Sequence, residues 1–180
     1  MRRLLLVVVV IVCGCKKEPQ PEPAVAPAIV EQLKASEQRA IERERPACGN
    51  AKAVFDSSVR VNDEGFLHLV ERGGDFVEEP IPGLDVVVAR ARRFHFTLDY
   101  PFEKPFTGEV QGELTLRKAI TAIRAGFRTM YGASTVKEIP GMLNKQVTGA
   151  YGESFHDIDD LVIEGIDLCD DHSLQLSIGS

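Results

Sequence analysis

The densest group of side chains that could carry out chemistry lies between Glu153 and Asp160, in the sequence ESFHDIDD. His156 is followed by Asp157, Asp159 and Asp160, and imidazole and carboxylate groups together suit a divalent cation. The order differs from an EF-hand loop, which also needs a central glycine and a glutamate at position 12. The run therefore allows two interpretations. One is a metal site serving a hydrolase, and the other, which we expect, is a solvated loop whose acids cap a turn.

Other catalytic motifs are incomplete. Gly152 to His156 reads GESFH, which begins like a nucleophile elbow but ends in histidine where that motif needs glycine. Cys48 lies in the sequence ACGN, which matches no thiol-protease signature, and no glycine-rich loop ends in the Lys-Ser/Thr of a phosphate loop. We therefore expect no cofactor and favour a protein that is not an enzyme.

Five arginines form a second candidate site. Arg117, Arg124 and Arg128 follow helical spacing on the polar side of an amphipathic segment, while Arg90 and Arg92 lie in a strand-like segment. If the two segments are neighbours, these side chains could form a basic patch that binds carboxylates, phosphates or an anionic polymer. The alternative is that the arginines pair with the acids of the chain or stay solvated.

The charge balance excludes one class of partner. The chain has 21 lysines and arginines against 27 aspartates and glutamates, for a net charge of −6. Nonspecific nucleic-acid binding depends on basic groups that neutralise phosphates, so we expect no nucleic-acid partner.

The N-terminus combines a positive start, a short apolar run and two cysteines. Arg2 and Arg3 precede an unbroken apolar run from Leu4 to Val12. A membrane-spanning helix needs ~20 apolar residues, so this run is too short to span and fits the core of a secretory signal peptide. The run ends VCGC at residues 12–15, which resembles the lipobox of bacterial lipoproteins. The alternatives are a plain secreted protein or a buried strand.

The lipobox resemblance covers residues 1–15 only and implies a location. It implies cleavage of a signal peptide at residues 1–14 and acylation of Cys15, which would anchor the chain to a membrane of the cell envelope through its lipid. The residue after Cys15 is Lys16, whereas an aspartate at this position resembles a signal for retention in the inner membrane. The resemblance therefore favours the outer membrane, with the protein facing the periplasm. The partners expected there are the membrane itself and an envelope protein or anionic polymer.

A proline-rich segment follows. With Cys15, residues 16–28 (KKEPQPEPAVAPA) form the predicted tether, because proline fixes φ and favours an extended, semi-rigid chain. Thirteen residues reach ~40 Å at ~3.1 Å per residue.

Two cysteines lie beyond the lipobox, Cys48 and Cys169. An even pair in an oxidising compartment predicts a disulfide, which would join the start of the domain to its last hairpin. Two unrelated buried thiols are the alternative.

The remaining pattern predicts one α+β domain over residues 29–180. Residues 29–45 predict a helix or stalk that ends before Pro46, and residues 115–131 predict a second helix with Thr115 as N-cap, one continuous apolar face and a left-handed cap at Gly132. Turns are expected at 62–65 and 72–75, loops at 99–114 and 132–152, and a bulged hairpin at 161–178.

The predicted fold is a mostly antiparallel sheet of five or six strands packed against the 115–131 helix. Residues 84–98 predict its main strand, with a break near residues 89–92 where arginines interrupt the apolar face. Two functions fit: a lipid-anchored protein that presents a binding or assembly domain, or a metal-assisted envelope hydrolase centred on His156.

Overall fold

The computed structural model describes residues 25–42 and 48–180 of the chain. The predicted signal peptide, Cys15 and most of the predicted tether lie outside the described residues. Two α-helices are described, α1 (Pro27–Glu42) and α2 (Leu116–Tyr131), together with one 3-10 helix, η1 (Ile158–Asp160). The last residues of the helix predicted over 29–45 lie outside the described part.

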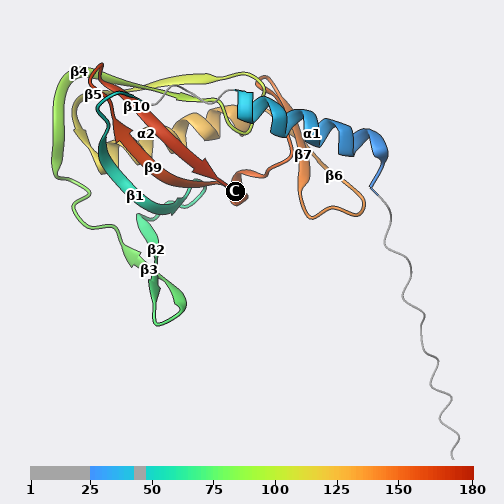
Figure 1. Ribbon diagram of the computed structural model, residues 1–180, viewed down its shortest axis with the longest axis horizontal. Helices are drawn as coiled ribbons and strands as arrows, with labels where there is room; N and C mark the ends of the chain where they lie inside the picture. The colour runs from blue at the N-terminus through green and yellow to red at the C-terminus, as the bar shows by residue number, and fades with distance from the viewer. Residues whose placement is uncertain (1–24, 43–47) are drawn as a thin grey trace, which may run out of the picture.

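A seven-stranded sheet forms the body of the protein (Figure 1). Its spatial order is β3-β2-β1-β9-β10-β4-β5, and every neighbouring pair is antiparallel except β10 and β4. In chain order these strands are β1 (Lys52–Arg60), β2 (Leu67–Arg72), β3 (Asp75–Pro80), β4 (Val87–Leu98), β5 (Phe106–Thr115), β9 (Val162–Leu168) and β10 (Ser173–Gly179). A smaller sheet has the order β6-β7-β8, with β6 (Thr135–Glu138), β7 (Lys145–Gly149) and β8 (Gly152–Ser154).

The α+β class is as predicted, but the prediction of five or six strands was wrong. The strands that were not predicted are β5, β6, β7 and β8, which lie in or extend just beyond the segments expected to be loops, 99–114 and 132–152. Gly108 helped to mislead, because it lies inside β5 opposite Phe96 rather than in a turn. A Cβ at Gly108 would come within 2.2 Å of the Phe96 ring, so the glycine permits a close approach inside the sheet.

Helix α2 packs its apolar face against the sheet. Thr115 caps its start by accepting a hydrogen bond from the backbone N–H of Lys118, as predicted. The left-handed cap expected at Gly132 was wrong, since its φ is −63°. The predicted apolar face is buried and comprises Leu116, Ala119, Ile120, Ile123, Phe127 and Met130.

Two irregularities of the sheet follow the sequence predictions. The pairing of β4 with β5 shifts register between Arg90 and Arg93, within the predicted break. The hairpin of β9 and β10 shifts register next to Gly165, where a bulge was expected.

Among the described residues, neither α-helix combines the length and the apolar character needed to cross a membrane.

Candidate functional site

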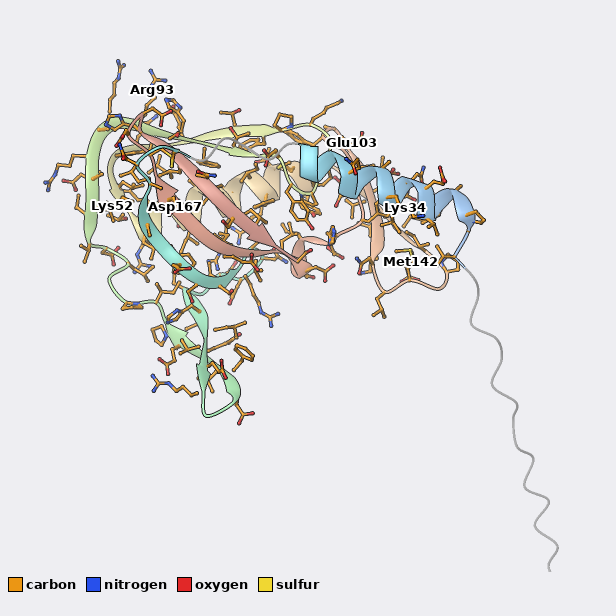
Figure 2. All side chains as sticks on the ribbon, in the orientation of Figure 1. Lys34, Lys52, Arg93, Glu103, Met142 and Asp167 are labelled. Carbon is orange, nitrogen blue, oxygen red and sulfur yellow. A yellow bond between two sulfur atoms is a disulfide. The ribbon has the colours of Figure 1, made fainter. Side chains whose placement is uncertain are left out.

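The hairpin of β2 and β3, Leu67–Pro80, projects from the body of the protein, and we call it the arm (Figure 1). Its register with the main sheet places Ser58 of β1 opposite Leu69, supported by a 2.9 Å hydrogen bond between Ser57 Oγ and His68 Nδ1. In Figure 2 the side chains of the arm extend on both sides, and no other described element lies beside its outer half. The arm is therefore held at its base and free along its length.

The arm ends in a two-residue turn. Gly73 and Gly74 have φ values of 63° and 92°, a combination that suits glycine and matches the twist of a tight hairpin. From Arg72 opposite Asp75 to Leu67 opposite Pro80, six residue pairs follow without a register shift. The arm is thus a regular, unbroken ribbon.

Among the strands of residues 25–42 and 48–180, β3 is the last on its side of the main sheet, so one edge of its backbone has no neighbouring described strand. In a two-residue hairpin the pair next to the turn exchanges backbone hydrogen bonds, and bonded and non-bonded pairs then alternate. Counting from Arg72 and Asp75, the N–H and C=O groups of Phe76 and Glu78 face away from β2. These groups form a free edge that another extended chain could use.

The side chains along this edge are apolar and acidic. The side chain of Phe76 is 71% exposed and that of Val77 is 37% exposed. Arg72 pairs with Glu79, which lowers the pKa of the Glu79 carboxyl through a side-chain hydrogen bond. Among the residues that the structure describes, no basic group pairs with Glu71, Asp75 or Glu78. The arm therefore offers uncompensated negative charge beside exposed apolar surface.

The base of the arm is fixed by a buried cation. Arg124 on α2 is only 3% exposed, and its guanidinium donates to the carbonyl oxygen of Arg60 at 2.7 and 3.1 Å and to that of Gly65 at 2.7 Å. Burial lowers the pKa of Arg124, and the nearby Asp63 carboxylate opposes this effect. The guanidinium also lies 5.3 Å from the centre of the Phe66 ring. Arg124 thus joins α2 to the turn that leads into β2.

Arg117 contacts the other side of this junction. Its guanidinium lies 4.6 Å from the centre of the Phe66 ring and forms two hydrogen bonds with the Asp85 carboxylate, at 2.7 and 2.9 Å. The pairing lowers the pKa of Asp85. At the other end of the arm's base, Ile81 N–H donates to Phe66 C=O. The two ends of the arm are therefore clamped together.

The remaining arginines of the predicted patch are Arg90, Arg92 and Arg128, and the charge of Arg128 is close enough to Arg124 to help lower its pKa. Arg90 pairs with Glu113 on β5 at 2.9 Å, while Arg92 and Arg128 have exposed side chains. Of the five candidates, Arg124 is buried, and Arg90 and Arg117 have carboxylate partners. These three arginines are therefore already engaged within the protein.

The acids of the 153–160 segment cap a turn. The Asp157 side chain accepts from the backbone N–H groups of Ile158 and Asp160, and the Asp160 side chain accepts from the backbone N–H of Asp157, so Asp157 and Asp160 form a capping box at the start of η1. Asp157 also pairs with Lys145 at 3.2 Å, and Asp159 accepts from the amide of Asn62. Within residues 25–42 and 48–180, no group of three or more His, Cys, Asp or Glu side chains is arranged to hold a metal ion.

His156 is joined to two tyrosines. Its Nε2 lies 3.0 Å from the hydroxyl of Tyr100, and its carbonyl oxygen accepts a 2.9 Å hydrogen bond from the hydroxyl of Tyr131. Burial raises the pKa of Tyr131 well above its ordinary value and, to a lesser degree, that of Tyr100. The raised pKa values keep both tyrosine hydroxyls protonated near neutral pH, so both can act as hydrogen-bonding partners of His156.

The disulfide predicted between Cys48 and Cys169 is present, with 5.5 Å between the two Cα atoms. It joins the segment before β1 to the turn between β9 and β10. The backbone N–H of Cys48 also donates to the side chain of Gln175 at 3.2 Å. The start of the sheet is thereby bonded covalently to its C-terminal hairpin.

Comparison with protein-family models, curated proteins and solved structures finds no match to this chain. Function is therefore inferred from the residues and their geometry. The sequence predicts the turn at 72–75, but the arm was not predicted as a site. The available signal was the Gly-Gly turn between two short apolar runs with acids on both sides.

Proposed function

We propose that this protein is a lipid-anchored component of the bacterial cell envelope that binds another protein through its arm. The exposed, acidic free edge of β3 carries this proposal. Backbone groups without a neighbouring strand, next to large exposed apolar side chains, are typical of surfaces that another chain covers. The clamped base supports the same function, because it holds the edge in one orientation.

The location rests on three features of the sequence and one of the fold. The apolar run before VCGC, the resemblance to a lipobox and the proline-rich segment after Cys15 favour a lipid anchor with a spacer. The disulfide between Cys48 and Cys169 is consistent with export, because disulfides persist in oxidising compartments. Helix α1 begins at Pro27, inside the predicted tether, so residues 16–26 remain as the proposed spacer. At ~3.1 Å per residue it would reach up to ~34 Å and hold the arm away from the lipid surface, where a protein partner can reach it.

The arm is better suited to a protein than to the bilayer. Glu71, Asp75 and Glu78 surround the exposed Phe76, and insertion of its ring into a membrane would bring these carboxylates to the lipid headgroups. Anionic headgroups repel such a surface. We therefore assign membrane attachment to the lipid on Cys15 and protein binding to the arm.

Site-specific photo-crosslinking tests this proposal. A photoreactive amino acid replaces Phe76 in the full-length protein, expressed in its host and isolated with the membrane fraction. The matched control places the same group at Val86, which is 63% exposed but lies outside the arm. We expect a discrete protein adduct from position 76 and not from position 86. Equal labelling at both positions, or adducts with lipid alone, would contradict the proposal.

A further inference from the structure

We infer that the partner contributes an extended segment that adds as a new strand beside β3, with basic residues opposite Asp75, Glu78 and Glu79 and apolar residues opposite Phe76 and Val77. This inference rests on the proposed function and specifies how the arm binds and what it recognises. The observations that carry it are the free backbone edge, its regular register and the order of charged and apolar side chains along it.

The backbone of β3 is prepared for strand addition. Six consecutive pairs with β2 keep register, so the outward groups of Phe76 and Glu78 recur at the regular spacing that a third strand requires. The opposite edge of the sheet differs. Strand β5 contains Gly112 with a φ of 73°, and its pairing with β4 has two register shifts. Such irregularities discourage an added strand on β5, and β3 has none in its pairing with β2.

The arm also gains stability from a third strand. Two-stranded ribbons are marginally stable in water, and only the base of the arm is supported by β1. An added strand would bond the outward backbone groups and cover the ring of Phe76. Pairing of this kind provides affinity through the main chain, while the side chains provide specificity.

The side chains define the chemistry of the partner. Directly opposed cross-strand pairs are favourable when they are apolar or of opposite charge and unfavourable when charges are alike. Opposite positions 79 to 75, an antiparallel segment therefore reads basic, basic, apolar, apolar, basic, and the basic residue opposite Glu79 shares that carboxylate with Arg72. The same preference disfavours a second copy of this chain, because antiparallel pairing of two β3 strands centred on Val77 places Asp75 opposite Glu79.

Peptide binding to the purified full chain tests this inference. The probe is the end-capped peptide TKKVVKT, and the reversed peptide TKVVKKT tests the parallel orientation. We expect at least one of them to bind. The acidic peptide TEEVVET should not bind, and neither should a copy of the better binder with N-methyl groups on alternate backbone nitrogens. Failure of both basic peptides to bind, or equal binding of the N-methylated copy, would overturn the inference.

Two variants at one position separate charge from backbone pairing. Glu78→Gln removes the charge and keeps the outward N–H, so binding should weaken about two- to five-fold, as for an exposed ion pair. Glu78→Pro also removes that N–H but no hydrogen bond to β2, so binding should weaken at least about ten-fold. Retained protection of the Val77 and Glu79 amides from hydrogen exchange would show that the hairpin persists in the proline variant. Equal affinity of the two variants would contradict strand addition.

The experiments distinguish a failure of this inference from a failure of the proposed function. If Phe76 crosslinks to a protein in the membrane fraction but Glu78→Pro leaves that adduct unchanged, the arm binds a partner by another mode and strand addition is wrong. If the arm instead binds phosphatidylglycerol vesicles and no peptide, both statements fail.

Discussion

Replacement of Arg124 by methionine tests whether a buried cation holds the arm in place. Methionine keeps an unbranched apolar stem but removes all three hydrogen bonds to the carbonyl oxygens of Arg60 and Gly65. A buried carbonyl left without a donor costs about 1–3 kcal/mol. For two carbonyls, with some relaxation toward water, we expect the free energy of unfolding to fall by about 3 kcal/mol.

Urea unfolding of the oxidised protein, followed by circular dichroism, measures this loss. With a denaturant dependence of about 2 kcal/mol per molar, the midpoint should fall by roughly 1.5 M. The matched control is Arg128→Met on the same helix, where the arginine is exposed and the change should stay within about 0.5 kcal/mol. Arg124→Lys keeps the charge but cannot reproduce the planar fork, so an intermediate loss is expected. A cost for Arg124→Met no larger than that of the control would refute the reasoning.

Three further predictions concern the body of the protein. Cys48→Ser should lower the free energy of unfolding by about 3–5 kcal/mol, because the disulfide closes a loop spanning 121 positions. Adding a reductant to the wild-type protein should cause the same loss. A loss under about 1 kcal/mol would contradict a stabilising role of the disulfide. Gly108→Ala should lower the free energy of unfolding, measured in urea, by about 2 kcal/mol, because the added Cβ would meet the buried Phe96 ring. The control Gln111→Ala on the same strand, where the side chain is exposed, should lower it by less than about 0.5 kcal/mol. Equal losses in the two variants would contradict the packing of Gly108 against Phe96. Burial raises the pKa of Tyr131 in the folded state, so the hydroxyl ionises first in the unfolded state, and the free energy of unfolding should fall as pH rises above about 10. Tyr131→Phe should make the free energy of unfolding less dependent on pH in this range. The same pH dependence in the variant and the wild type would show that Tyr131 is not buried as described.

Local patterns in the sequence predicted much of the secondary structure. The buried face of α2, the turns at 62–65 and 72–75, and the irregular strand near residues 89–92 follow from periodicity and from turn chemistry. The disulfide followed from cysteine count and the expected compartment. These features depend on residues that are close in sequence or on a single pair.

The features that decide function depend on the order of the strands, which local patterns do not contain. The free edge of β3 exists because β2 pairs with β1 on one side and with β3 on the other, and no further described strand lies beyond β3. Arg124 has the spacing of a polar helix face, yet it is buried and donates hydrogen bonds to the carbonyl oxygens of Arg60, at the end of β1, and of Gly65, in the turn that follows. The charge and spacing of Arg124 predict a surface position, whereas its hydrogen-bond partners hold it in the interior.

The most direct test of the account is residue-resolved hydrogen exchange along β3 in the full-length protein, without and with the bound basic peptide. In the free protein, the amides of Phe76 and Glu78 should exchange rapidly, while those of Val77 and Glu79, which face β2, should be protected. When the peptide is bound, the Phe76 and Glu78 amides should become protected as well. Continued rapid exchange of these two amides under saturating peptide would show that the free edge of β3 is not the binding surface.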